Sequence, residues 1–271
     1  MIVSAGHSLI FMLGRPIAQA KSPALMNSWF AQRNIACATL PLHLSETGLR
    51  SALQLVRHSE NVQGAIVTIP FKREVASYLE ELSEASLVLD AVNVIRKTAD
   101  GCLFGDMLDG EAMLCALRAR RISIRGRRVF VAGCGGAGSA MAFSACIAGA
   151  GRVRLMDVDD SCAEKLAAAL LKRFPNCDIR TTASPGDSDV LINATPLGMN
   201  ADDDIPIGLT NAADTLVVDA VTSLTDTPWV RACKARGWAT IGGNELAAAQ
   251  LPLLLAFFGH PSSPLSIISA H

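Results

Sequence analysis

Residues 127–146 read RRVFVAGCGGAGSAMAFSAC and join a short apolar run, a group of glycines and an alanine-rich stretch. The apolar run has the length and β-branched content of a buried strand, and the alanine-rich stretch has the composition of a buried helix. The turn between them, Gly133 to Gly138, satisfies the pattern G-x-G-x-x-G. In this context the pattern predicts a βαβ unit that binds the pyrophosphate of a dinucleotide at the helix N-terminus. Close packing of the helix on the sheet is the alternative reason for the glycines.

The next predicted strand ends at Asp157, which lies 24 residues after Gly133. An acidic side chain at this offset accepts hydrogen bonds from the adenosine ribose and would repel a 2′-phosphate, so it favours NAD over NADP. The alternative is that an acid at 157, 159 or 160 caps the next helix, where Ser161 and Glu164 form a capping-box pattern. The predicted cofactor-binding residues are Gly133, Gly135, Gly136, Ala137, Gly138, Asp157, Asn193, Thr195 and Val221.

Strand-length apolar runs recur along the chain with helical stretches between them, which is typical of βα units and mostly parallel sheets. The fold class we predict is α/β with two domains: an N-terminal substrate domain with a mostly parallel sheet, and a Rossmann dinucleotide-binding domain. Residues 1–105 plus 242–271 are assigned to the substrate domain, because the closing helix after Gly243 follows the last Rossmann strand. Residues 106–241 are assigned to the Rossmann domain. The expected strands are 8–14, 37–44, 64–70, 91–97, 127–133, 152–157, 189–195 and 215–221.

The composition excludes several other classes of function. With 271 residues and a net charge of −1, the chain offers no basic face for nucleic acid. Its eight cysteines show no C-x-x-C pattern, so we expect reduced thiols, no metal site and a cytoplasmic protein. The N-terminus lacks the basic start of a signal peptide, and the apolar run 246–258 is shorter than a membrane span. A small molecule is therefore the expected partner, with neither nucleic acid nor membrane.

An enzyme that oxidises an alcohol with a nicotinamide needs a side chain that takes the hydroxyl proton. The five histidines occupy terminal or polar settings, and none has a clear claim. Lys72 follows the apolar strand AIVTIPFK, which would place it at the carboxyl edge of the sheet. Partial burial would lower its pKa from the unperturbed value of about 10.4. From spacing alone, a solvated lysine at the start of a helix is the favoured interpretation.

The first-domain motifs and the glycine turn together resemble the shikimate dehydrogenase family, which includes the quinate/shikimate and aminoshikimate dehydrogenases. The similar blocks span nearly the whole chain, and several of them are specific to that family. They are GRPIAQAKSP at 14–23, VTIPFK at 67–72, AVN at 91–93, GDMLDG at 105–110, GCGGAG at 133–138, NATPLGM at 193–199, and Gln250.

The resemblance implies that Lys72 is the catalytic acid/base and that Asp106 is its partner across the crevice. Asp109 is then interpreted as a helix cap that fixes the hinge. The resemblance also implies a cyclic hydroxy acid as substrate, and we include a homodimer among the expected assemblies. Ser22 as a helix cap and Asn93 as a turn residue stay open as alternatives. The implied substrate-binding residues are Ser22, Thr68, Asn93, Thr222 and Gln250.

The chain departs from the family pattern at positions that would bind substrate. Ala20 replaces a serine, Ile66 replaces an asparagine, and Thr222 stands at the position of a tyrosine. Asn244 to Leu246 replaces a glycine-methionine block, and Met107-Leu108 replaces Asn-Thr. Each lost hydrogen bond to a neutral group costs roughly 0.5–1.5 kcal/mol, so two or three losses lower shikimate turnover by roughly 10- to 1000-fold.

We therefore expect an NAD-dependent oxidoreductase of a shikimate-like cyclic acid, with weak activity on shikimate itself. A quinate dehydrogenase is one alternative, in which Thr222 or Glu245 would accommodate the extra hydroxyl of quinate. A non-catalytic NAD-binding sensor of the same fold is another.

Overall fold

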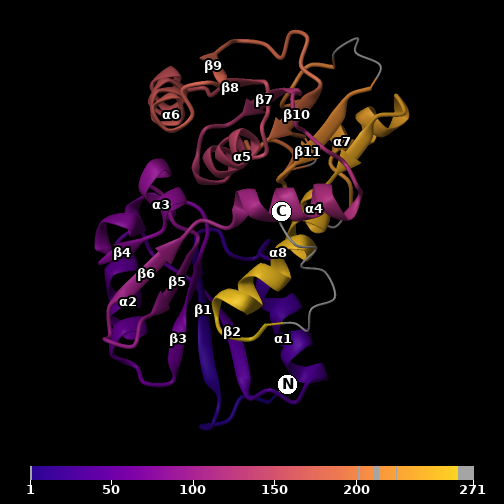
Figure 1. Cartoon of the computed structure of the whole chain (residues 1–271). Coiled ribbons are helices and arrows are strands. Elements are labelled where there is room, and N and C mark those ends of the chain that lie inside the picture. The colour runs from indigo at the N-terminus through magenta and orange to yellow at the C-terminus, as the bar shows by residue number, and fades with distance from the viewer. Residues whose placement is uncertain (1, 201, 210–213, 224, 262–271) are drawn as a thin grey trace.

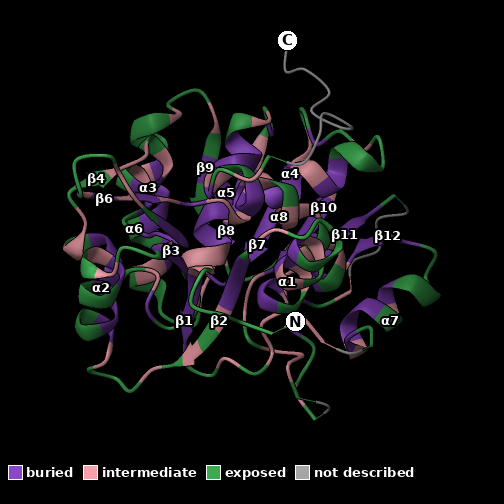
Figure 2. Ribbon diagram, turned by 90° about the horizontal axis from the view of Figure 1, so that it is seen from below, coloured by how far each residue is buried: buried purple, intermediate pink, exposed green. Residues whose placement is uncertain are grey.

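The structure is a computed structural model that describes residues 2–200, 202–209, 214–223 and 225–261. Within these ranges the chain forms two six-stranded sheets, and helices pack on both (Figure 1). Buried residues are concentrated in the strands of both sheets and in the helix faces turned toward them (Figure 2). The predicted α/β class and two-domain organisation are confirmed. Part of the predicted substrate domain, 262–271, lies outside the described residues.

The first sheet has the strand order β2-β1-β3-β5-β6-β4. Strand β1 pairs in parallel with β2 and β3, whereas β5 pairs antiparallel with both β3 and β6. The strands are β1 (Ser8–Gly14), β2 (Cys37–His43), β3 (Val62–Val67), β4 (Glu81–Leu82), β5 (Val94–Lys97) and β6 (Leu103–Asp106). The helical elements around it are α1 (Ser22–Gln32), α2 (Leu49–His58), the 3-10 helix η1 (Glu74–Tyr78) and α3 (Glu84–Leu89).

The second sheet is parallel throughout, with the order β12-β11-β10-β7-β8-β9. The direction of winding reverses between β7 and β10, and ligands of such sheets bind at the carboxyl ends of the strands at that point. The strands are β7 (Arg128–Ala132), β8 (Arg152–Met156), β9 (Asp178–Thr181), β10 (Val190–Asn193), β11 (Leu216–Asp219) and β12 (Ala239–Ile241). The helices are α4 (Asp109–Ala119), α5 (Gly136–Ile147), α6 (Asp160–Arg173) and α7 (Pro228–Ala235).

Two segments tie the sheets together, the loop before α4 and the helix α8 (Gly243–Phe257). Met107 is buried in the core around β7 and α5, while its neighbour Leu108 packs against the core formed by β1, α1 and α8. Helix α8 also contacts both cores. Leu246 belongs to the core around β7 and α5, and Leu254 belongs to the core formed by β1, α1 and α8. The apolar pair Met107-Leu108 therefore connects the two domains.

Three predicted helix caps are wrong. Lys21 occupies the N-cap of α1, and Ser22 is already in the helix beside Pro23, whose fixed φ suits the first turn. Leu108 occupies the N-cap of α4, so Asp109 lies in the first turn and caps nothing. The capping box of Ser161 and Glu164 is the third: Asp159, one of the three acids considered as caps, caps α6 instead and accepts a hydrogen bond from the N–H of Ser161.

All eight cysteines are free thiols, and four of them are buried. Across the described ranges, the helices are too short or too polar to span a bilayer.

Candidate active site

The glycine turn after β7 has the geometry that a dinucleotide requires. Gly133 has a φ of +90°, and a Cβ there would lie 2.7 Å from the carbonyl carbon of Ala194. A Cβ on Gly138 would lie 1.8 Å from the carbonyl oxygen of Gly133, so the start of α5 packs directly on the turn. A Cβ on Gly135 would meet nothing within 4 Å. The turn therefore leaves open space in front of the unbonded N–H groups of the first turn of α5, and these residues fit a bound pyrophosphate.

Asp157 lies directly after β8 and holds the glycine turn. Its Oδ2 accepts a hydrogen bond of 2.6 Å from the N–H of Cys134, and its Oδ1 accepts one of 3.0 Å from the N–H of Asp159. The groove beside it, between the ends of β8 and β9, has a volume of about 410 Å³. Three carboxylates line that groove, those of Asp157, Asp160 and Glu164, and no lysine or arginine lines it.

The residues predicted after β10 and β11 shape the same edge. Asn193 is buried, its Nδ2 donates to Asp219 at 2.9 Å, and its Oδ1 accepts from the hydroxyl of Thr195 at 2.7 Å. Asp219 also accepts from the hydroxyl of Thr227 and from the N–H of Val221. Burial raises the pKa of Asp219 against these hydrogen bonds. The side chains of Asn193 and Thr195 thus hold the turns after the strands.

Lys72 and Asp109 form an ion pair at the centre of the crevice between the two sheets. Their side chains are 12% and 14% exposed, respectively. The Lys72 Nζ donates to Oδ2 of Asp109, while Oδ1 accepts from Asn93 Nδ2 at 2.6 Å and from Gln250 Nε2 at 2.8 Å. The side-chain Oδ1 of Asn93 in turn accepts from the N–H of Leu108 at 2.8 Å. Side chains from three other segments of the chain, Lys72, Asn93 and Gln250, therefore meet at the Asp109 carboxylate.

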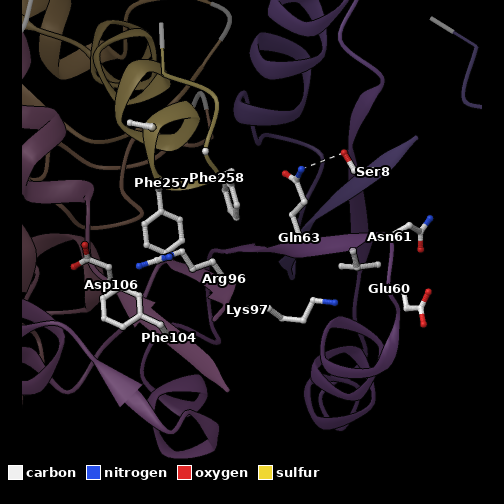
Figure 3. Close-up of a pocket in the computed structure, with 13 residues that line it drawn as sticks. Ser8, Glu60, Asn61, Gln63, Arg96, Lys97, Phe104, Asp106, Phe257 and Phe258 are labelled. Atoms are coloured by element: carbon white, nitrogen blue, oxygen red, sulfur yellow. Dashed lines mark hydrogen bonds between the residues drawn. The ribbon is translucent and has the colours of Figure 1, made fainter. Parts of the chain in front are cut away.

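The prediction that Asp106 faces Lys72 is wrong. Asp106 ends β6, and its Oδ1 accepts a hydrogen bond from the N–H of Met107. Figure 3 shows its carboxylate in a different and larger cavity of about 840 Å³, beside Arg96, Phe104 and Phe257. Lys72 does not line that cavity.

The difference between the two aspartates follows from how the chain leaves β6. Met107 and Leu108 enter opposite cores, and α4 begins immediately after them. The carboxylate that projects into the crevice is therefore the one in the first turn of α4. This position also places the negative charge of Asp109 at the positive end of the helix dipole.

The Lys72-Asp109 pair lies in a cleft of about 160 Å³. Of the predicted substrate-binding residues, four line the cleft, whereas Asn93 acts through Asp109. The four are Ser22, Thr68, Thr222 and Gln250. The hydroxyl of Thr222 donates to the carbonyl of Gln19 at 3.4 Å and so closes one side of the cleft.

Sequence reasoning missed three residues here. Asp109 is an acid at the start of a helix, and this pattern predicts a helix cap, not a partner of Lys72. Lys21 lines the cleft and pairs with no carboxylate in the described ranges. Arg73 donates from Nη2 to the carbonyl oxygen of Cys134, within the glycine turn, at 2.7 Å. Lys21 lies within the block GRPIAQAKSP, which could have singled it out, whereas Arg73 lies just after the block VTIPFK.

Comparison with known proteins decides the family. The model of the shikimate dehydrogenase substrate binding domain matches residues 12–95. Shikimate dehydrogenase (NADP(+)) of Rubrobacter xylanophilus is 32% identical over 90% of this chain and 87% of its own length. The chain belongs to the shikimate dehydrogenase family. It is therefore an oxidoreductase that uses a pyridine nucleotide.

Two solved structures show how far this family fold extends. Shikimate 5-dehydrogenase from Listeria monocytogenes, in complex with shikimate and NAD, is 25% identical, with a TM-score of 0.83 over 97% of this chain and 95% of that one. The 5-ketofructose reductase of Gluconobacter sp. strain CHM43 is also 25% identical, with a TM-score of 0.83 over 94% of each chain. Two proteins with very similar folds are thus named for different substrates, a cyclic acid and a neutral sugar ketone.

Three of the residues that depart from the family pattern, Ala20, Ile66 and Glu245, contact the apolar core or another side chain. Ile66 is buried, and Ala20 packs on the same core as Ile66. Glu245 forms a bidentate ion pair with Arg120, at 2.6 Å for both contacts, and does not line the cleft. Of these residues only Ala20 lines the cleft, which therefore lacks the hydroxyl that the family pattern has at position 20.

Proposed function

We propose that this protein is an NAD-dependent oxidoreductase that interconverts a hydroxyl and a ketone on a shikimate-like cyclic polyhydroxy carboxylic acid. Shikimate itself is a weak substrate in this proposal. The observation that carries it is the Lys72-Asp109 ion pair, which lies in a polar cleft next to the glycine turn.

Lys72 moves the proton. A dinucleotide held at the glycine turn, Gly133 to Gly138, would supply or accept the hydride. In the direction of reduction, the Lys72 ammonium gives its proton to the ketone oxygen, which becomes the hydroxyl. In the direction of oxidation, the neutral amine takes that proton back. Asp109 orients the lysine and stabilises its positive charge, and Asn93 and Gln250 fix the carboxylate by donating to its second oxygen.

The groove beside Asp157 supports the choice of NAD. A 2′-phosphate in that groove would face three carboxylates without a lining cation, and the repulsion would weaken binding. The ribose hydroxyls of NAD, in contrast, can donate hydrogen bonds to Asp157. The Rubrobacter relative is named as an NADP(+) enzyme. In this proposal the two proteins therefore differ in the dinucleotide that they use.

The charge balance of the cleft supports an acid as substrate. Lys21, Lys72 and Asp109 are its charged lining residues, and Lys72 is already neutralised by Asp109. Lys21 is left as the cation that a substrate carboxylate can approach. Because Ala20 and Ile66 supply no hydrogen bonds, the hydroxyls of shikimate itself find fewer partners, and its turnover is expected to be weak.

Two alternatives make different use of the same cleft. Quinate loses one of its two suggested donors, since Glu245 is held by Arg120, and only Thr222 remains. A neutral polyhydroxy ketone, the substrate class in the name of the Gluconobacter neighbour, would suit a cleft that has lost polar groups but would leave Lys21 unpaired.

One panel tests the proposal. Shikimate, quinate, aminoshikimate, dehydroshikimate and 5-ketofructose are each offered with NAD(H) and NADP(H), and the absorbance of the reduced nicotinamide is followed. The proposal predicts that kcat/KM is higher with NAD(H), that acids exceed the neutral ketone, and that shikimate is turned over slowly. Equal or faster turnover with NADP(H) contradicts the assignment of NAD, and a preference for the neutral ketone contradicts the acid.

A further inference from the structure

Arg73 comes from the substrate domain but lies on the cofactor's glycine turn. Its Nη2 donates to the carbonyl oxygen of Cys134 at 2.7 Å, and the buried Ser139 hydroxyl donates to the same oxygen at 2.9 Å. The preceding residue also lies on the turn, because a Cβ added to Gly136 would lie 2.8 Å from the Cδ of Lys72. The adjacent residues 72 and 73 thus sit against the start of α5.

The charge of Arg73 has no carboxylate partner within the described ranges, although it is held at a fixed place. Burial raises the pKa of the Cys134 thiol to about 12, and Asp157 acts in the same direction, whereas the Arg73 charge opposes them. The same guanidinium lowers the pKa of the Cys162 thiol against the larger effect of Asp159. The hydrogen bond to the Cys134 carbonyl fixes the guanidinium on the glycine turn, and its charge acts on both thiols.

A dinucleotide brings a diphosphate with two negative charges to this turn. The helix N-terminus supplies N–H groups and a partial positive charge, but the turn itself contains no cationic side chain. Lys72 is neutralised by Asp109, and the neighbouring groove is acidic. Arg73 is therefore the side chain placed to balance the charge of the diphosphate, and its planar fork retains free N–H groups beyond the bond to Cys134.

We propose that Arg73 binds the diphosphate of the dinucleotide from the opposite side of the crevice, so that the substrate domain contributes directly to cofactor binding. The inference rests on dinucleotide binding at the glycine turn and not on the identity of the acid substrate.

Equilibrium binding without substrate tests this inference. Dissociation constants of NADH, ADP and adenosine are measured by fluorescence and calorimetry for the wild type, Arg73→Ala and Arg73→Lys. We expect Arg73→Ala to weaken ADP and NADH binding about 10-fold while adenosine binding is unchanged, since a hydrogen bond to a charged group is lost. Arg73→Lys should restore part of the loss, and the difference should shrink at high salt. Thermal unfolding verifies that the variants fold.

The control is Arg50→Ala, which removes an exposed arginine of the same domain that lies over the Tyr78 ring. It should leave all three constants unchanged. Wild-type affinity of Arg73→Ala for ADP would overturn the inference, as would an equal loss for adenosine. Comparison of ADP with 2′,5′-ADP separates the two phosphate positions. A loss confined to 2′,5′-ADP would assign Arg73 to a 2′-phosphate and overturn its assignment to the diphosphate.

Discussion

The two sides of the crevice are fixed in different ways. On the second sheet, the cofactor edge is set by backbone: Gly133 at positive φ, Gly138 against the turn, and Asp157 bonded to a turn N–H. On the first sheet, the substrate edge is set by side chains that meet at Asp109 from separate elements. Backbone requirements permit few replacements, whereas a side-chain pocket can exchange its lining without loss of the fold. The proposed change of substrate therefore falls on the second kind of edge.

Lys72→Ala gives the largest expected effect and separates the two edges. Removal of the acid/base should lower kcat roughly 10²- to 10⁴-fold, while the Kd of NADH changes little. The control Lys97→Ala removes a lysine of the same domain that donates to the carbonyl of Ser59. It should leave kcat near the wild-type value. Unchanged turnover in Lys72→Ala would show that the protein is not an enzyme of this kind.

Gly138→Ala attacks the cofactor edge. The added methyl would lie 1.8 Å from the carbonyl oxygen of Gly133, so the helix must move off the turn. We expect a loss of about 1–3 kcal/mol in the free energy of unfolding, together with NADH binding weakened more than 10-fold. The matched control is Gly208→Ala, because a Cβ there would meet nothing within 4 Å. Gly237 is unsuitable, since its φ of +77° would strain an alanine. Denaturant unfolding and fluorescence titration provide the two values.

Asp157→Ser tests the choice of cofactor. Removal of the carboxylate should raise the NADP/NAD ratio of kcat/KM about 10-fold, since a charge that repels the 2′-phosphate is lost. Asp160→Ser, at the first residue of α6 in the same groove, should produce a smaller change because that carboxylate does not bond the turn. A ratio that does not change in Asp157→Ser would remove the physical basis for NAD.

Lys21→Met gives the smallest expected effect and sharpens the account of the substrate edge. Loss of this partly exposed cation should raise KM for an acid substrate about 3- to 10-fold with little change in kcat. It should leave KM for a neutral polyhydroxy ketone unchanged. The control Lys172→Met changes an exposed lysine in α6, far in sequence from the cleft. Equal effects of Lys21→Met on acid and neutral substrates would refute its role in binding a carboxylate.

The sequence predicted the strand, the glycine turn and the helix of the second sheet well, because their requirements are local. A glycine turn between a strand and a helix shows its purpose in consecutive residues, and Asp157 follows at a fixed offset. The strand at 8–14 was predicted residue for residue, since a buried strand is a continuous apolar run. The antiparallel pairing of β5 was not predicted, because periodicity carries no information about strand direction.

The substrate edge was harder to predict because it depends on long-range geometry. The choice between Asp106 and Asp109 is decided by which cores receive Met107 and Leu108, and no local pattern shows this. Arg73 and Lys21 reach their places through long side chains across the crevice or beside it. The family resemblance identified the block GDMLDG but assigned its two acids in the wrong order.

The paired substitutions Asp109→Asn and Asp106→Asn test the central claim, that Lys72 and Asp109 act together as the acid/base unit. The substitutions are the same in kind and three residues apart in the chain. With the best acid substrate of the panel, Asp109→Asn should lower kcat about 10²-fold or more, and Asp106→Asn should keep kcat within about threefold of the wild type. The reverse order, or near-wild-type turnover by Asp109→Asn, would contradict the account.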